Sequence, residues 1–75
     1  MGKVIKKLRE ERNMSQEDLA KLTCIFNQTQ ISKIELGIRV LKEDEVIIFA
    51  NIFKVTISKL YSYSWKVSYD LIFIW

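Results

Sequence analysis

The densest run of uncharged hydrogen-bonding side chains in the sequence is Asn27-Gln28-Thr29-Gln30. An amide side chain can donate to and accept from adenine in the major groove of DNA, and a threonine methyl group can pack on the methyl group of thymine. This chemistry predicts base contacts by Gln28, Thr29 and Gln30. The alternative is a solvated helix start, in which Gln30 caps the backbone at Asn27 instead of contacting a base.

Further polar and cationic side chains follow this run. Ser32 and Lys33 come about one helical turn later as further candidates for base contact, and Lys33 reaches a base or a phosphate. Arg39 and Lys42 lie in the next loop, as candidates for phosphate contact or for an approach to the minor groove. The acids at 43–45 cluster at a helix start, which leaves these cations to face DNA. The alternative is an ordinary solvated basic loop.

Other chemistries lack the residues that they require. The chain has no histidine, one cysteine and no glycine-rich loop. Neither a nucleophile–base pair nor a set of metal ligands can therefore be assembled. We expect no enzymatic activity, no metal site and no cofactor, and no small-molecule ligand is evident.

The length and composition predict one small folded domain. The chain has 75 residues, of which 49% are apolar, and a net charge of +3. This combination excludes intrinsic disorder, which needs low hydrophobicity and high charge. The longest apolar run, residues 71–75, is far below the roughly 20 residues of a membrane span. The single cysteine suits a reducing compartment, so we expect a cytoplasmic protein without a membrane partner.

The sequence pattern predicts five short helices between residues 4 and 61. Proline is absent and glycine occurs only twice, which favours helices joined by short polar turns. Ser15 with Asp18, Asn27 with Gln30, and Thr56 are typical of helix starts, and Gly37 is typical of a helix end. Ile5 and Leu8 share one helical stripe with Arg12, and the residues expected on the apolar faces of the next three helices are Leu19, Ala20, Leu22, Ile31, Ile34, Val46, Phe49, Ala50 and Phe53.

Two of these segments carry a resemblance to a known family. Ser15-Gln-Glu-Asp-Leu-Ala20, followed by Gln30-Ile-Ser-Lys-Ile-Glu-Leu-Gly37, resembles the helix-turn-helix domain of the Cro and phage-repressor type, the XRE family. Residues 5–12 resemble the first helix of that domain, and residues 49–60 resemble its last two. The resemblance implies an all-α, five-helix, repressor-like domain over residues 1–61 that binds double-stranded DNA.

The resemblance also assigns roles to single residues. Matching positions of the family place Gln16 at the DNA backbone, where the free amides of a helix start suit a phosphate. Asn27, which opens the next helix, is a second candidate for backbone contact. The family often pairs the positions of Arg9 and Glu35 in a partly buried ion pair. The alternative for these two residues is a pair of exposed charges.

The turn between the second and third helices departs from the family pattern. The alanine of the second helix and the inward aliphatic residue of the third usually lie ten positions apart, with glycine in the turn. Here Ala20 and Ile31 are eleven apart, and Cys24 stands where glycine is expected. Because a positive φ strains a cysteine, we expect a longer, rearranged turn instead of Cys24 in that conformation.

The tail, residues 62–75, lies outside the resemblance. Apolar and polar residues alternate from Ser62, as in a half-buried strand, although a helix with Tyr63, Val67 and Leu71 on one face also fits. A lone strand cannot satisfy its own backbone, so we expect it to pair with the same segment of a second subunit. The alternative is a tail that folds back onto its own helices. The residues expected at the dimer interface are Tyr63, Trp65, Val67, Tyr69, Leu71, Phe73 and Trp75.

These features together predict a sequence-specific regulator of transcription that binds double-stranded DNA. We expect a repressor that acts as a homodimer on a palindromic operator. The alternative is an antitoxin-like or other protein-interaction module that binds a partner through its tail. A membrane-surface tail is less well supported, because Lys66 and Asp70 cancel each other's charge.

Overall fold

The computed structural model describes residues 1–62 of the 75-residue chain. Its first four helices are α1 (Gly2–Glu11), α2 (Gln16–Thr23), α3 (Gln28–Glu35) and α4 (Glu43–Phe53). A fifth helix begins at residue 57 and continues to residue 62. No strand occurs among these residues, and the prediction of an all-α, five-helix domain is confirmed. From Tyr63 onward, the predicted dimerisation tail lies outside the described residues.

Hydrogen bonds between residues three apart start three of the helices. Ser15 Oγ accepts from the backbone N–H of Asp18 at 3.0 Å, and Asp18 Oδ2 accepts from the backbone N–H of Ser15 at 3.0 Å. Asn27 and Gln30 form the same reciprocal arrangement at the start of α3. Thr56 Oγ1 accepts from the backbone N–H at position 59 at 3.0 Å. The predicted helix starts at Ser15, Asn27 and Thr56 are therefore confirmed.

A residue with positive φ follows the last turn of each of the four helices. Gly37 has a φ of 80° after α3, which confirms the predicted helix end. Asn13, Cys24 and Lys54 have φ values of 55°, 62° and 57° after α1, α2 and α4. The expectation that Cys24 avoids this conformation was wrong. Residues 24–27 form the longer turn, and Cys24 still takes the left-handed conformation that ends α2.

The buried face of α2 differs from the predicted one. Leu19 and Ala20 are buried as expected, but Leu22 is 55% exposed. Thr23 takes the inward position, because at 3.6 residues per turn it falls between Leu19 and Ala20 around the helix. Its hydroxyl group donates to the carbonyl oxygen of Ala20 at 2.7 Å and accepts from the backbone N–H of Phe26 at 3.1 Å. The prediction for Leu22 was wrong.

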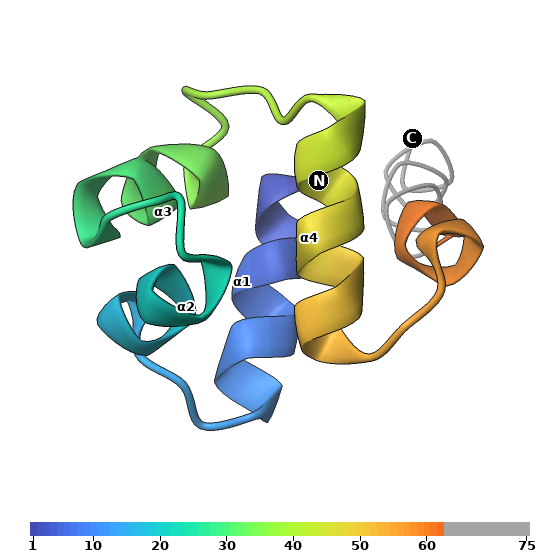
Figure 1. Cartoon of the computed structure of the whole chain (residues 1–75), viewed down its shortest axis with the longest axis horizontal. Coiled ribbons are helices and arrows are strands. Elements are labelled where there is room, and N and C mark those ends of the chain that lie inside the picture. The colour runs from blue at the N-terminus through green and yellow to red at the C-terminus, as the bar shows by residue number, and fades with distance from the viewer. Residues whose placement is uncertain (63–75) are drawn as a thin grey trace, which may run out of the picture.

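The helices pack so that α3 has one free side. α2 packs on α3, α1 packs on α3 and α4, and α2 also contacts α4. In Figure 1, α3 lies at one end of the long axis and the fifth helix lies at the other, with α1 and α4 between them. Gly2 allows close packing at the end of α3, since a Cβ atom there would overlap the carbonyl oxygen of Ile34. The outer side of α3 is left facing away from the described helices.

Candidate nucleic-acid interface

The outer side of α3 carries the side chains that were predicted to contact bases. Gln28, Thr29 and Lys33 are exposed, and Ser32 is half-buried beside them. The inner side of the helix is fixed in the core through residues such as Ile31, whose exposed fraction is 0%. Four of the five predicted base-contacting residues therefore share one accessible surface.

The fifth residue, Gln30, takes part in the capping box of α3. Asn27 Oδ1 accepts from the backbone N–H of Gln30 at 2.9 Å, and Gln30 Oε1 accepts from the backbone N–H of Asn27 at 2.9 Å. The acceptor oxygen of each amide is thus engaged within the protein. Each side chain keeps its NH2 group for a further partner, which suits donation to a DNA acceptor.

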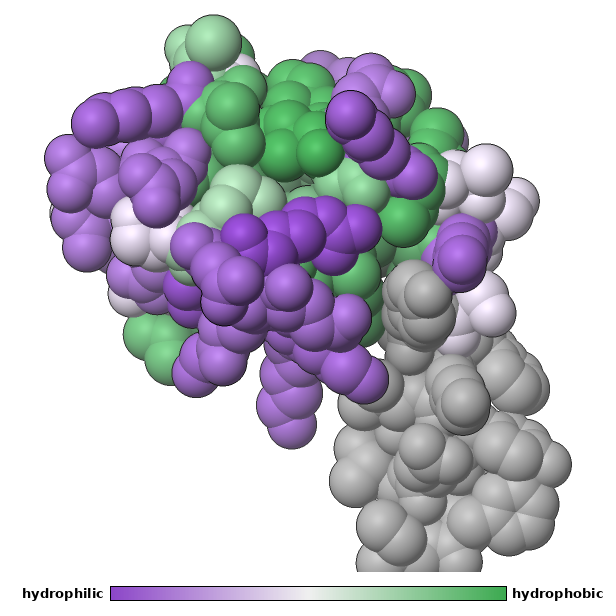
Figure 2. Space-filling model, turned by 90° about the horizontal axis from the view of Figure 1, so that it is seen from below, coloured by the Kyte–Doolittle hydropathy of each residue, from purple (hydrophilic) through white to green (hydrophobic). Residues whose placement is uncertain are grey.

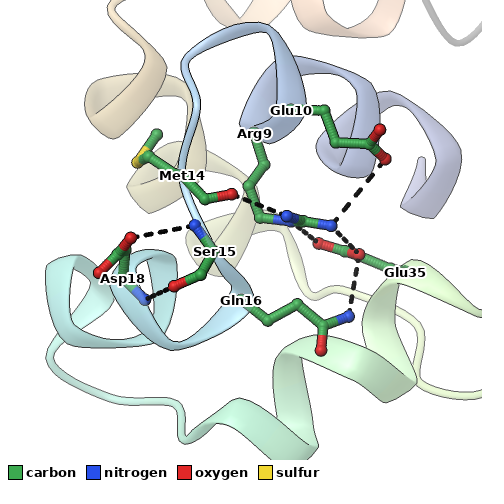
Figure 3. A network of polar contacts seen from close by, with 7 residues as sticks. All are labelled: Arg9, Glu10, Met14, Ser15, Gln16, Asp18 and Glu35. Atoms are coloured by element: carbon green, nitrogen blue, oxygen red, sulfur yellow. Dashed lines mark hydrogen bonds and ion pairs between the residues drawn. The ribbon is translucent and has the colours of Figure 1, made fainter.

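A buried arginine–glutamate pair connects α1 to the end of α3 (Figure 3). Arg9 Nε donates to Glu35 Oε2 at 2.8 Å, and Arg9 Nη2 donates to Glu35 Oε1 at 3.2 Å. Arg9 Nη1 donates to the carbonyl oxygen of Met14 at 2.8 Å. The side chains of Arg9 and Glu35 are only 12% and 3% exposed. The two positions that the resemblance pairs thus form a bidentate ion pair inside the fold.

The same carboxylate also positions Gln16. Gln16 Nε2 donates to Glu35 Oε1 at 3.2 Å, so Glu35 joins the first residue of α2 to α1 and α3. The hydrogen bond to Glu35 raises the pKa of the Arg9 guanidinium, although burial acts in the opposite direction. One amide hydrogen of Gln16 remains for another acceptor, so the predicted phosphate contact starts from a side chain whose orientation is already fixed.

The loop between α3 and α4 carries two residues that were predicted to contact phosphates, and their surroundings differ. Lys42 is exposed. Arg39 Nη2 donates to Glu45 Oε2 at 2.7 Å, and the guanidinium carbon of Arg39 lies 5.0 Å from the centre of the Phe26 ring. The sequence analysis grouped Arg39 with the cations that face DNA, but its guanidinium contacts the protein.

Charged and polar side chains cover the centre of the surface that is drawn in Figure 2, while apolar side chains gather toward its upper edge. On the outer side of α1, the cations Lys3, Lys6 and Lys7 are exposed, but so are the acids Glu10 and Glu11. Because acids offset these cations, the net charge alone does not mark the DNA-binding surface. The uncharged and cationic residues on the outer side of α3 are the candidate surface.

Comparison with known families agrees with this geometry. The helix-turn-helix family model, of the Cro/C1 type, matches residues 5–60. The chain belongs to the Cro/C1-type helix-turn-helix family. The match extends from α1 into the fifth helix, and the chain is accordingly a DNA-binding regulator of transcription of the XRE type. A search of curated proteins finds no match.

Membrane-spanning helices and metal sites are both absent from the part of this Cro/C1-type chain that the structure describes. No helix among residues 1–62 is long and apolar enough to cross a membrane. Within the same residues, no group of three or more histidine, cysteine, aspartate or glutamate side chains is arranged to hold a metal ion.

Sequence reasoning missed the contact between Phe26 and Arg39 and the part that Glu45 plays in it. An apolar residue directly before a helix N-cap often packs on the first turns of the helix, and Phe26 precedes Asn27 in this way. That pattern was available in the sequence and would have placed Phe26 in the core. The partner of Arg39 was harder to find, because four acids lie within six residues of it.

Proposed function

We propose that this Cro/C1-type regulator is a sequence-specific repressor that binds a palindromic operator as a homodimer. The observation that carries the proposal is the arrangement of α3. Its outer side exposes Gln28, Thr29 and Lys33, while Ile31 and Glu35 hold its inner side in the fold. A helix that is fixed on one side and polar on the other suits insertion into the major groove.

In the proposed complex, the first turn of α3 enters the major groove. Gln28 contacts adenine, Thr29 contacts the methyl group of thymine, and Lys33 contacts a base or a phosphate. Ser32 contributes a hydroxyl group on the same side. Gln16 binds a phosphate from the start of α2, where a helix N-terminus favours an anion.

The proposed dimer accounts for affinity as well as symmetry. One chain has a net charge of only +3, and two chains on one operator double the number of phosphate contacts. Two recognition helices about 34 Å apart would occupy successive major grooves on one face of DNA. Residues 62–75 are the proposed dimerisation segment, through the apolar side chains of the tail. A repressor of this kind needs only to occupy a promoter.

Selection of duplexes from a random DNA library tests the proposal directly. We expect an enriched palindrome, whose two halves are separated by about one DNA turn. Gln28→Ala is expected to weaken binding by about 1–3 kcal/mol and to relax the preference at one base pair. Lys42→Ala is the matched control. Loss of a phosphate contact weakens binding to all sequences alike, and it lowers by about one the slope of the logarithm of affinity against the logarithm of salt concentration. An unchanged base preference in Gln28→Ala would reject the role of α3.

The oligomeric state is tested separately. Light scattering of the full chain is expected to give twice the mass of one chain, and truncation after Tyr61 is expected to give monomers that bind the operator much more weakly. A full-length monomer at tens of micromolar that binds one half-site undiminished would reject the dimer. Transcription in vitro from a promoter that contains the selected site distinguishes a repressor from an activator.

A further inference from the structure

The residue before the cap of α3 and a residue in the loop after α3 contact each other. Phe26 directly precedes Asn27, the N-cap of α3, and Arg39 lies in the loop that follows the helix. The guanidinium carbon of Arg39 is 5.0 Å from the centre of the Phe26 ring. A guanidinium at this distance from an aromatic ring is attracted to the π-system. The contact therefore closes the chain around the recognition helix.

Both partners of this contact are attached to α4. Arg39 Nη2 donates to Glu45 Oε2 at 2.7 Å, while Glu45 Oε1 accepts from the backbone N–H of Lys42 at 2.9 Å. The ring of Phe26 stacks on that of Phe49, with centres 6.0 Å apart and an angle of 13° between the planes. The two ends of α3 are thus held by the first two turns of the same helix.

The orientation of Arg39 favours a role inside the protein over a phosphate contact. Its Nε atom is buried and has no hydrogen-bond partner among the described residues. One nitrogen is held by Glu45 and the guanidinium lies over Phe26. A side chain free to bind phosphate would direct its donors to solvent. Here Nη2 is directed at Glu45 of α4, and Nε is enclosed by the fold.

We propose that Arg39 is a positioning residue, which sets the orientation of α3 by holding Phe26 and Glu45 together on α4. The proposal rests on the proposed function, in which α3 contacts bases. Residues 24–27 connect α2 to α3, and Cys24 there has a positive φ. The attachment of Phe26 therefore fixes how the chain enters α3. Arg39 affects sequence preference through Phe26 and without a contact of its own to DNA.

The test compares two glutamates in the first turn of α4. Glu45→Gln removes the ion pair with Arg39 but keeps an acceptor for the backbone N–H of Lys42. Glu43→Gln is the matched control, since Glu43 is exposed and its loss changes the net charge equally. The probes are the duplex that the wild-type chain selects from a random library and a scrambled duplex of equal length. Affinity is measured over a series of salt concentrations.

The two possible roles of Arg39 predict opposite results. For a positioning residue, Glu45→Gln weakens binding to the selected duplex by about tenfold, within the range for residues that act through their neighbours, and Glu43→Gln does not. Both variants bind the scrambled duplex at least as well as the wild type. If Arg39 were a phosphate contact, Glu45→Gln would free it, and binding to both duplexes would tighten. That result would overturn the proposal.

A second variant keeps the proposal testable if Glu45→Gln folds poorly. Arg39→Lys retains the charge but loses the flat guanidinium that stacks on Phe26. We expect weaker binding to the selected duplex, an unchanged salt slope, and amide exchange in α3 that is at least threefold faster than in the wild type. Unchanged affinity and unchanged exchange would overturn the role of Arg39. A wild-type chain that selects no sequence would instead overturn the proposed function itself.

Discussion

Arg9 pairs with Glu35 in the interior of the domain, and Arg39 pairs with Glu45 nearer its surface. The inner pair has side chains that are 12% and 3% exposed, and those of the outer pair are 37% and 11% exposed. The inner pair holds α3 to α1, while the outer pair holds the loop after α3 to α4. Two ion pairs of the same residue types thus fix α3 and the loop that follows it, one in the interior and the other nearer the surface.

The difference lies in what accompanies each pair. Around the inner pair, Glu35 also accepts from Gln16 and Arg9 also donates to the carbonyl oxygen of Met14, so the buried charges have several hydrogen-bonded partners. The outer arginine relies on one carboxylate and on an aromatic ring. Because removal of one member of a buried pair leaves an uncompensated charge, the inner pair controls whether the domain folds. The outer pair contributes more to where α3 is held.

The largest expected effect comes from breaking the inner pair. Glu35→Ala should lower the free energy of unfolding by about 3–5 kcal/mol, because Arg9 then remains buried without its counter-charge. Urea denaturation followed by circular dichroism measures this loss. The double variant Arg9→Met with Glu35→Leu should recover part of it. A double-mutant cycle with no coupling energy would contradict the importance of the pair.

Breaking the outer pair should cost less. Arg39→Met keeps the apolar stem of the side chain and removes the charge, and we expect a loss of about 1–2 kcal/mol from the hydrogen bond and the contact with Phe26. The same denaturation experiment applies. A loss as large as that of Glu35→Ala would remove the distinction between the two pairs.

Acid should weaken the outer ion pair and the helix cap at Asp18. Hydrogen bonding to the Lys42 backbone, assisted by Arg39, lowers the pKa of Glu45 despite its burial, and hydrogen bonds from Ser15 lower the pKa of Asp18. A carboxyl group whose pKa is lowered by folding stabilises the fold when the pH is above its pKa in the unfolded chain, about 4. This stability is lost as the pH falls through the pKa in the folded chain. The pKa of Arg9 is raised, so the stability that it contributes is lost only as the pH rises through the folded pKa, in strongly alkaline solution.

The corresponding measurement is the free energy of unfolding between pH 7 and pH 2. The wild type should lose stability below about pH 4, and the double variant Asp18→Asn with Glu45→Gln should lose less over that interval. Curves of equal slope for the two proteins would contradict the assigned pKa shifts.

The smallest effect is expected at an exposed pair that serves as a reference. Lys21 Nζ lies 3.8 Å from Glu17 Oε1, one turn along α2, with the two side chains 74% and 65% exposed. Lys21→Ala should change the free energy of unfolding by less than about 0.5 kcal/mol, because solvent screens such pairs. A change of about 2 kcal/mol or more for Lys21→Ala would mean that burial does not determine how much each ion pair contributes to the free energy of unfolding.

The predicted helix boundaries that held depend on residues close together in the sequence, whereas the Arg9–Glu35 pair, 26 positions apart, was implied by the family resemblance. The helix starts at Ser15 and Asn27 follow from hydrogen bonds to residues three positions away, and the helix end at Gly37 follows from its freedom to adopt positive φ. The sequence left two roles open for Gln30, base contact and capping of α3, and the structure contains the capping hydrogen bond. Local chemistry therefore located α2 and α3, and with them the side of α3 that carries the proposed base contacts.

The predictions that failed depend on tertiary packing. Leu22 fits an apolar spacing, but α2 turns Thr23 inward instead, and only the neighbouring helices determine that choice. Cys24 keeps a positive φ because the turn must lead Phe26 into the core. The DNA contact of Arg39 stays a prediction, but its contact with Glu45 depends on α4 and could not be found from the charges in the sequence.

The residues that hold α3 in place are different from those on its outer side. Phe26, Ile31 and Glu35 face the fold, whereas Gln28, Thr29 and Lys33 face solvent. Exchange of the outer residues as a block therefore leaves the attachments of the helix intact. Under the proposed function, one scaffold can acquire new operators by substitutions that do not disturb its folding. A panel of such chains would supply regulators that act in the same cell without binding one another's DNA sites.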